Sequence, residues 1–392
     1  MSMLPPFVAF AGSLITCWLL VRTCHLHGHL TLDGVQGAQK IHQGAVPRVG
    51  GLGLAGGLLL GGALLTHGGP LWWFVVLGAL PAFTAGLWED LTKKVGVRAR
   101  FLATIFAGAL FAELTGYSLH HLDLWPVDVL LGVPAVAVLF TGFAIGGVAN
   151  AMNIIDGCNG LAAGTAMILL GAFAAIAGIE GDYALLSIVL LSMAGVGGFF
   201  LINFPRGYIF LGDAGAYSMG FLIAAFAVAL PARHADISPV IGLLVVIYPV
   251  SETLYSIVRR MGKGGGAVGQ PDRLHLHSLT FKALEGRVAD PVLRNSLSSV
   301  LLWSLPLISS VMAVLLAWQS PALVLIAAAA NLVLYRLAYG LVARKARGQT
   351  RPEPRVAPQP APAPEPAEGH APEPVMVVEP EMSEPVLQDA TR

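Results

Sequence analysis

Long apolar runs with few charges follow one another along most of this chain, and they leave few folds open to it. A helix that crosses the hydrocarbon core of a bilayer needs about 20 mostly apolar residues. About eleven runs approach this length, at residues 4–24, 50–67, 71–87, 99–117, 128–148, 160–178, 183–203, 214–230, 237–257, 297–317 and 320–342. Charged residues make up 12% of the 392 residues, against about 25% in a soluble domain. The sequence therefore predicts an all-α, polytopic membrane protein with about eleven transmembrane helices.

Lys and Arg divide unevenly between the loops on the two sides of such a bundle. The loops on one side hold only Arg233. Those on the other side hold Lys40, Arg48, Lys93, Lys94, Arg98, Arg206, Arg259, Arg260, Lys263, Arg273, Lys282, Arg287 and Arg294. Basic loops remain in the cytoplasm, so we expect the N-terminus outside and the C-terminus inside. An odd number of spans agrees with this orientation.

The last part of the chain changes in composition. Residues 348–392 are rich in Pro, Ala and Glu, and such a segment cannot bury a core. We therefore expect a membrane domain at residues 1–347 and a disordered cytoplasmic tail at 348–392. A tail without a catalytic role is the interpretation we favour, and a partner-binding tail is the alternative.

Acidic and amide side chains gather at the predicted cytoplasmic ends of three apolar runs. Adjacent carboxylates at Glu89 and Asp90 repel each other unless a cation or metal neutralises them; the alternative is a solvated loop. Asp213 begins another run, either as a helix cap or as a ligand of Mg²⁺, which favours one or two carboxylates with phosphate oxygens. The third group is Asn150, Asn153 and Asp156, spaced by three so that a helix would place them on one face.

Cationic side chains form two further groups on the same side. Lys40, His42 and Arg48 precede a Gly-Gly helix start, an arrangement suited to anions but also to an ordinary basic flank. Arg273, His275 and His277 stand in the longest cytoplasmic loop, where phosphate binding fits better than zinc because no Cys cluster accompanies them. Glu252 is a lone acid in an apolar run, and helix packing explains it as well as function does. The convergence of five polar groups on one side predicts one active site there.

Taken together, these five ordered motifs resemble those of the polyprenyl-phosphate N-acetylhexosamine-1-phosphate transferase superfamily, which includes phospho-MurNAc-pentapeptide transferase. The resemblance runs from about residue 35 to residue 340. It implies an all-helical bundle with a cytoplasmic cleft, a bacterial inner-membrane location and a need for Mg²⁺. Val46-Pro47-Arg48-Val49-Gly50-Gly51 looks closer to the polysaccharide-initiating branch, whereas the peptidoglycan branch usually has Thr-Pro-Thr-Met-Gly-Gly.

The resemblance also implies roles for individual residues. Glu89 and Asp90 match the paired aspartates of the family, with Glu in place of the first. Asn153 and Asp156 match its Asn/Asp motif, and Asn159 stands where a second Asp is usual. Asp213 matches the Mg²⁺-binding aspartate, assisted by Asp156. The resulting assignment is catalytic Asp90, Glu89 and Asp156, with substrate-binding Lys40, His42, Arg48, Asn150, Asn153, Asn159, Arg273, His275 and His277.

The reaction implied is attack by undecaprenyl phosphate on the β-phosphorus of a UDP-sugar, with release of UMP, to start a cell-surface polysaccharide. Asp90 either deprotonates the lipid phosphate or attacks first, and both routes remain open at this stage. Membrane lipid is the surrounding partner, nucleic acid has no part, and a homodimer remains open. The alternatives are the peptidoglycan transferase itself and, from a different class, an ion-coupled transporter, which would place acids near mid-bilayer.

Overall fold

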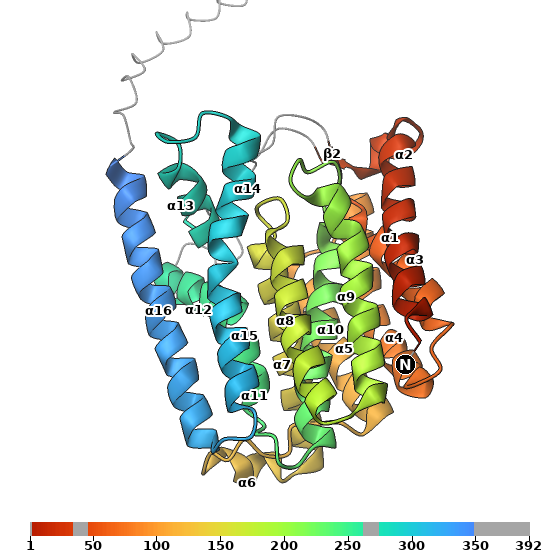
Figure 1. Cartoon of the computed structure of the whole chain (residues 1–392), viewed down its shortest axis with the longest axis vertical. Coiled ribbons are helices and arrows are strands. Elements are labelled where there is room, and N and C mark those ends of the chain that lie inside the picture. The colour runs from red at the N-terminus through yellow and green to blue at the C-terminus, as the bar shows by residue number, and fades with distance from the viewer. Residues whose placement is uncertain (1, 34–45, 262–273, 349–392) are drawn as a thin grey trace, which may run out of the picture. The chain divides into compact units, whose positions relative to one another are not determined.

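The computed structural model describes residues 2–33, 46–261 and 274–348, which form a bundle of helices with one short β-ribbon (Figure 1). The helices are α1 (Leu4–Arg22), α2 (Cys24–Thr31), α3 (Gly50–Gly62), α4 (Gly69–Thr92), α5 (Val97–Thr115), α6 (Val127–Leu131), α7 (Pro134–Ile155), α8 (Leu161–Ile179), α9 (Tyr183–Asn203), α10 (Gly212–Arg233), α11 (Ile241–Val245), α12 (Ile247–Met261), α13 (Leu276–Ala283), α14 (Pro291–Leu302), α15 (Ser304–Leu316) and α16 (Pro321–Gly348). Strands β1 (Leu32–Asp33) and β2 (Val46–Pro47) pair antiparallel.

The starts and ends of the helices follow from local sequence. Pro134 opens α7 at a position where a missing backbone N–H costs nothing. The Asp182 carboxylate accepts a hydrogen bond from the Leu185 N–H at 3.0 Å and caps α9. Asp290 caps α14 in the same way, accepting from the Val292 N–H.

The all-α, polytopic fold is confirmed. Among the described residues, 8 segments are long and apolar enough to cross a membrane: α1, α4, α7, α8, α9, α10, the α14–α15 pair and α16. The other three expected spans differ in detail. The run at 50–67 forms the shorter α3, the run at 99–117 forms α5 with Arg98, Arg100 and Glu113 inside it, and the run at 237–257 breaks at Val246 into α11 and α12.

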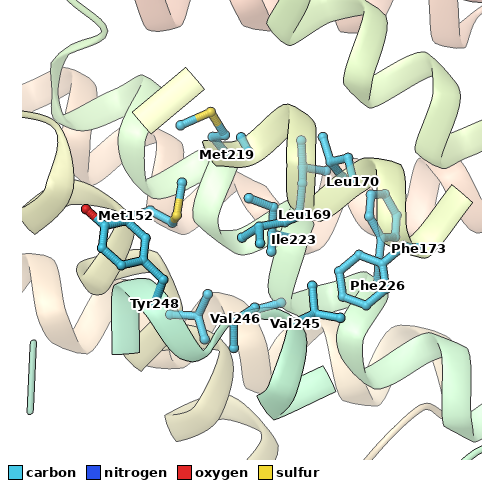
Figure 2. Close-up of a cluster of buried hydrophobic side chains, with 14 of the residues drawn as sticks. Met152, Leu169, Leu170, Phe173, Met219, Ile223, Phe226, Val245, Val246 and Tyr248 are labelled. Carbon is cyan, nitrogen blue, oxygen red and sulfur yellow. The ribbon is translucent and has the colours of Figure 1, made fainter. Parts of the chain in front are cut away.

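Helix α10 lies at the centre of the bundle and packs against α3, α4, α7 and α8. Most of its residues are buried, so it can be apolar around its whole circumference. Figure 2 shows part of this core, where side chains of four helices and the α12 start meet: Met152, Leu169, Leu170, Phe173, Met219, Ile223, Phe226, Val245, Val246 and Tyr248. The tight packing fixes the polar residues at the first turn of α10.

The two ends of the bundle carry different elements. Figure 1 shows α2, β2 and α13 at one end, and α6 at the other. The predicted acidic and cationic groups within the described residues lie on β2, α13 and the helix ends beside them. The expected tail, at 348–392, lies almost entirely outside the described residues.

Candidate functional site

The segment that contains Arg48 is fixed against the start of α10 by main-chain hydrogen bonds. The Phe210 N–H donates to the Pro47 carbonyl at 2.8 Å, and the Gly50 N–H donates to the Phe210 carbonyl at 2.9 Å. The Gly51 N–H donates to the Leu211 carbonyl at 2.8 Å. These bonds place the guanidinium of Arg48 beside the first turn of α10.

Asp213, in that first turn, is the centre of the site. It is 2% exposed, and three side chains donate to its carboxylate. Arg48 donates from Nη2 to Oδ1 at 2.5 Å, Asn153 donates from Nδ2 to Oδ1 at 3.1 Å, and Arg100 donates from Nη1 to Oδ2. A buried carboxylate must be neutralised in this way. Asp213 does not cap its own helix.

The cap of α10 comes instead from Asp90 on α4. Both oxygens of this fully buried carboxylate accept main-chain hydrogen bonds, from the Asp213 and Ala214 N–H groups, each at 2.9 Å. An anion at a helix N-terminus is favourable because the free N–H groups point at it. Gly212 permits the approach: its φ is +74°, and a Cβ there would lie 2.6 Å from Asp90 Oδ2.

Asp156 follows the last residue of α7 and is partly exposed. Its carboxyl accepts no hydrogen bond from any described residue. Burial raises its pKa to about 7; the charge of Arg48 opposes this rise, and the charges of Asp213 and Asp90 add to it. A cation bound beside this carboxyl group would stabilise its ionised form. Mg²⁺ needs only one or two protein carboxylates beside phosphate and water oxygens, so Asp156 with Asp213 fits it.

The histidine segment is held by Glu252 of α12. His275 Nδ1 lies 2.9 Å from Glu252 Oε1, and the Leu276 N–H donates to the same oxygen at 3.1 Å. Tyr335 donates its hydroxyl to Oε2 at 2.8 Å. The rings of His275 and His277 stack with their centroids 5.5 Å apart. Glu252 therefore positions the imidazole of His275, on which the ring of His277 stacks.

His277 connects this segment to the end of α7. A Cβ on Gly157, the residue after Asp156, would lie 2.1 Å from His277 Nε2, so only glycine leaves room for the ring. Nδ1 of His277 is buried without a hydrogen-bond partner among the described residues. Burial lowers the pKa of His277 to about 4; Glu252 opposes this effect and His275 adds to it. The ring is therefore neutral at pH 7.

Several predicted residues have other contacts in this structure. Asn150 donates to Thr104 Oγ1 and to the Gly146 carbonyl, each at 2.8 Å, and so joins α7 to α5. Asn159 donates to the Pro205 carbonyl at 3.0 Å. Glu89 accepts from the Val95 N–H at 2.8 Å, within the α4–α5 connection. Lys40, His42 and Arg273 lie outside the described residues.

Arg100, which the structure places on Asp213, is a site residue that the sequence motifs do not predict. An arginine in the first turn of a largely apolar helix is a signal that could have found it. Packing and function explain Glu252 equally well from the sequence, and its hydrogen bonds to His275 and Leu276 favour a positioning role.

These features define a class of protein. It is a polytopic membrane protein whose buried carboxylates, guanidinium groups and imidazoles meet at one end of the bundle. Such a donor set suits phosphate groups together with a divalent cation.

Known proteins with similar sequences are all transferases. Residues 72–231 match the sequence model of glycosyl transferase family 4. A probable undecaprenyl-phosphate N-acetylglucosaminyl 1-phosphate transferase of Bacillus subtilis is 26% identical over 241 residues, which are 61% of this chain and 66% of that protein. An undecaprenyl-phosphate alpha-N-acetylglucosaminyl 1-phosphate transferase of Yersinia pestis is 28% identical over 255 residues, 62% of this chain and 68% of the relative. The central part of the chain is thus similar to glycosyl transferase family 4.

Other similar proteins are named as phospho-N-acetylmuramoyl-pentapeptide-transferases. A phospho-N-acetylmuramoyl-pentapeptide-transferase of Streptococcus thermophilus is 33% identical over 157 residues, 40% of this chain and 45% of the relative. A Streptococcus pneumoniae protein of the same name is 24% identical, with 57% of its length covered. The chain thus spans less than two thirds of several of these relatives, including the one from Bacillus subtilis.

Proposed function

We propose that this protein transfers a sugar 1-phosphate from a UDP-sugar to undecaprenyl phosphate, releasing UMP, and so starts a cell-surface polysaccharide. The observation that carries the proposal is the meeting of Asp213, Asp156, Arg48 and Arg100 at one end of the bundle. This arrangement combines a cation site with guanidinium donors, and both are needed where two phosphate-bearing substrates approach each other. The names of the Bacillus and Yersinia relatives support the same reaction and suggest N-acetylglucosamine as the first sugar to test.

The bond changes are simple. An oxygen of the lipid phosphate forms a bond to the β-phosphorus of the UDP-sugar, and the bond from that phosphorus to the bridging oxygen breaks. The electron pair leaves with UMP. Arg48 and Arg100 donate hydrogen bonds to phosphate oxygens, and His277 lies against Gly157, the residue after Asp156. Asp156 and Asp213 would hold Mg²⁺, which when bound neutralises charge on the pyrophosphate and the departing UMP.

The contacts of Asp90 favour the direct route. Both of its oxygens already accept hydrogen bonds from the main chain of α10, so attack by Asp90 would first have to break the cap of that helix. Removal of a proton from the lipid phosphate requires a smaller change in the hydrogen bonds of this carboxylate than nucleophilic attack does. A one-step transfer, without a covalent enzyme intermediate, therefore fits the site better.

The proposed location is the bacterial inner membrane, with the N-terminus outside and the site and C-terminus in the cytoplasm. Among the described residues, the basic side chains gather at the end of the bundle that contains the site. Arg233 lies at the last turn of α10, at the opposite end. Retention of basic residues in the cytoplasm supports this orientation.

The test is direct assay of the purified full chain in detergent with undecaprenyl phosphate, Mg²⁺ and a panel of UDP-sugars. UDP-N-acetylglucosamine, UDP-N-acetylgalactosamine and UDP-MurNAc-pentapeptide form the arms, with UMP release measured and the lipid product identified by mass. We expect Mg²⁺-dependent transfer of an N-acetylhexosamine 1-phosphate. Transfer from UDP-MurNAc-pentapeptide alone would establish the peptidoglycan reaction instead, which the Streptococcus relatives favour. Folded protein that releases no UMP in any arm would refute the proposal.

A further inference from the structure

A second group of titratable side chains lies at the other end of α10, about 30 Å from Asp213 by the rise of a 22-residue helix. It joins the α8–α9 connection, which contains Glu180 and Asp182, to the α10–α11 connection, which contains His234 and Asp236. One side-chain oxygen or nitrogen from each of Glu180, His234 and Asp236 lies within 4.8 Å of those of the other two. The proposed transferase reaction uses none of these residues.

The imidazole of His234 faces a carboxylate on both sides. Its Nε2 lies 3.1 Å from Asp182 Oδ2, and its Nδ1 lies 3.2 Å from Glu180 Oε2. Asp182 is bound by Arg233, which donates from Nε at 2.5 Å and from Nη2 at 2.8 Å. An ionised carboxylate can only accept, so Nε2 of His234 donates its proton to Asp182.

That hydrogen bond determines what Nδ1 can do. In a neutral imidazole whose Nε2 is protonated, Nδ1 has a lone pair. Here the lone pair would face an oxygen of Glu180 at 3.2 Å, with the Asp236 carboxylate nearby. Two electron-pair donors at this distance repel each other unless a cation or a proton lies between them. The spacing is about that between ligands of a tetrahedral ion bound at about 2.0–2.1 Å.

We propose that Glu180, His234 and Asp236 bind a divalent transition-metal ion, with Zn²⁺ the best fit. An imidazole with two carboxylates suits Zn²⁺, whereas Mg²⁺ and Ca²⁺ prefer oxygen ligands throughout. The surroundings are those of a metal site: Asp182 orients the histidine through its other ring nitrogen, a common arrangement around zinc. Trp318, after α15, donates from Nε1 to Glu180 Oε1 at 2.5 Å and orients that ligand.

Asp236 makes the proposal testable without risk to the fold. It is exposed, so Asp236→Asn should leave folding intact while removing a charged ligand. His234→Gln removes the nitrogen ligand. Asp123→Asn is the matched control, because Asp123 is also exposed and lies 3.5 Å from a histidine, His121. All variants should lack a His tag.

The chain has a second feature that attracts zinc. His25 and His29 are exposed and stand four residues apart on α2, a spacing that places two imidazoles on one helical face. The experiment is therefore done in a background with both replaced by Ala. Full-length protein in detergent is freed of metal with a chelator, and Zn²⁺ is titrated against a competing chromogenic chelator at pH 7.5.

We expect one Zn²⁺ per chain, with affinity at least about tenfold weaker in Asp236→Asn and His234→Gln and unchanged in Asp123→Asn. Zn²⁺ should also raise the unfolding midpoint of the background protein but not of Asp236→Asn. Co²⁺ in the same site should give the visible absorption of a four-coordinate ion. Absence of saturable Zn²⁺ binding, or equal affinity in Asp236→Asn and Asp123→Asn, would overturn the proposal. Either result would indicate that a proton on His234 Nδ1, and not a metal ion, lies between His234 and Glu180.

Discussion

Two aspartates at the start of α10 have the same charge but different surroundings. Asp213 receives only side-chain donors, from Arg48, Arg100 and Asn153. Asp90 accepts two main-chain N–H groups and lies 3.4 Å from Arg48 Nε. Side-chain donors can turn toward a substrate, whereas the main chain of a central helix cannot. We therefore expect the loss of Asp213 to affect chemistry, and the loss of Asp90 to affect stability as well.

Asp213→Asn should lower kcat by about 10²–10³, as expected for the loss of one electrostatic contact to the reacting groups. The start of α10 should survive because Asp90 supplies its cap. UMP release is measured over a range of Mg²⁺ concentrations, with the amount of folded protein checked. Asp123→Asn is the control and should retain most activity, since Asp123 is exposed and lies in the α5–α7 connection, which contains α6 at the opposite end of the bundle (Figure 1). Near-normal turnover of Asp213→Asn with an unchanged Mg²⁺ requirement would remove Asp213 from the proposed metal site.

Asp90→Asn should lower the free energy of unfolding by about 1–3 kcal/mol, because an amide offers one acceptor oxygen to two buried N–H groups. Asp128 provides a comparison. Its carboxylate also accepts from two main-chain N–H groups, those of Leu122 and Leu124, but in a more exposed setting. Asp128→Asn should therefore cost less. Chemical or thermal unfolding in detergent measures both, and an equal loss in the two variants would argue against the cap as the source of the effect.

The raised pKa of Asp156 predicts a pH dependence of stability. In the unfolded chain this carboxyl ionises near 3.8, and in the folded protein near 7. The unfolded state loses its proton first, so the folded protein should lose stability as the pH rises from about 4 to 7. Mg²⁺ should then stabilise the protein more at pH 8 than at pH 5. Unfolding midpoints with Mg²⁺ or a chelator test this, and Asp156→Asn should reduce both effects. If the unfolding midpoints of the parent protein and of Asp156→Asn changed equally with pH and with Mg²⁺, the raised pKa of Asp156 would be contradicted.

At the scale of elements, the hydrophobic pattern predicted where helices lie better than how each one is built. Apolar runs predicted the positions of the long helices because burial in a bilayer requires such runs. The break at Val246 and the short length of α3 depend on packing, and hydropathy is not sensitive to packing.

The sequence also predicted that the polar groups at the helix ends would meet. No local pattern predicts that Arg100 pairs with Asp213 or that Asp90 caps α10. The partners in these two contacts are 113 and 123 residues apart in the sequence.

A close approach between two helix backbones supplies a test at this scale. A Cβ on Gly51 would lie 2.4 Å from the main-chain nitrogen of Gly215, so α3 and α10 touch through their backbones. Gly51→Ala should force these helices apart, cost about 1–3 kcal/mol of stability and reduce UMP release, because Arg48 precedes α3 directly.

Gly171→Ala in α8 is the matched control for Gly51→Ala. A Cβ at Gly171 would meet no atom within 4 Å. Alanine is the better helix former by about 0.5–1 kcal/mol, so this variant should be as stable as the parent or more so, with normal activity. Equal stability in Gly51→Ala and Gly171→Ala would show that α3 and α10 can separate without cost.

At the scale of the whole molecule, the distribution of basic residues makes a prediction about orientation. A reporter that is active only in the cytoplasm, fused near residue 380, should be active. The same reporter inserted near Asp123, in the α5–α7 connection, should be silent. The physical reason is the retention of basic loops on the cytoplasmic side. The reverse pattern would place the carboxylate site outside, where cytoplasmic UDP-sugars do not reach it.

The central place of α10 also determines when the site can form during synthesis. Asp213 is made 165 residues after Arg48 and 113 residues after Arg100, so most of the bundle enters the membrane before this carboxylate exists. Asp90, on α4, likewise precedes by 123 residues the main-chain N–H of Asp213 that it binds. Arg48, Asp90 and Arg100 are therefore synthesised first, and α10, the helix that all three contact, is synthesised later. A chain that stops before residue 212 contains many spans of the bundle but has no helix to join these residues.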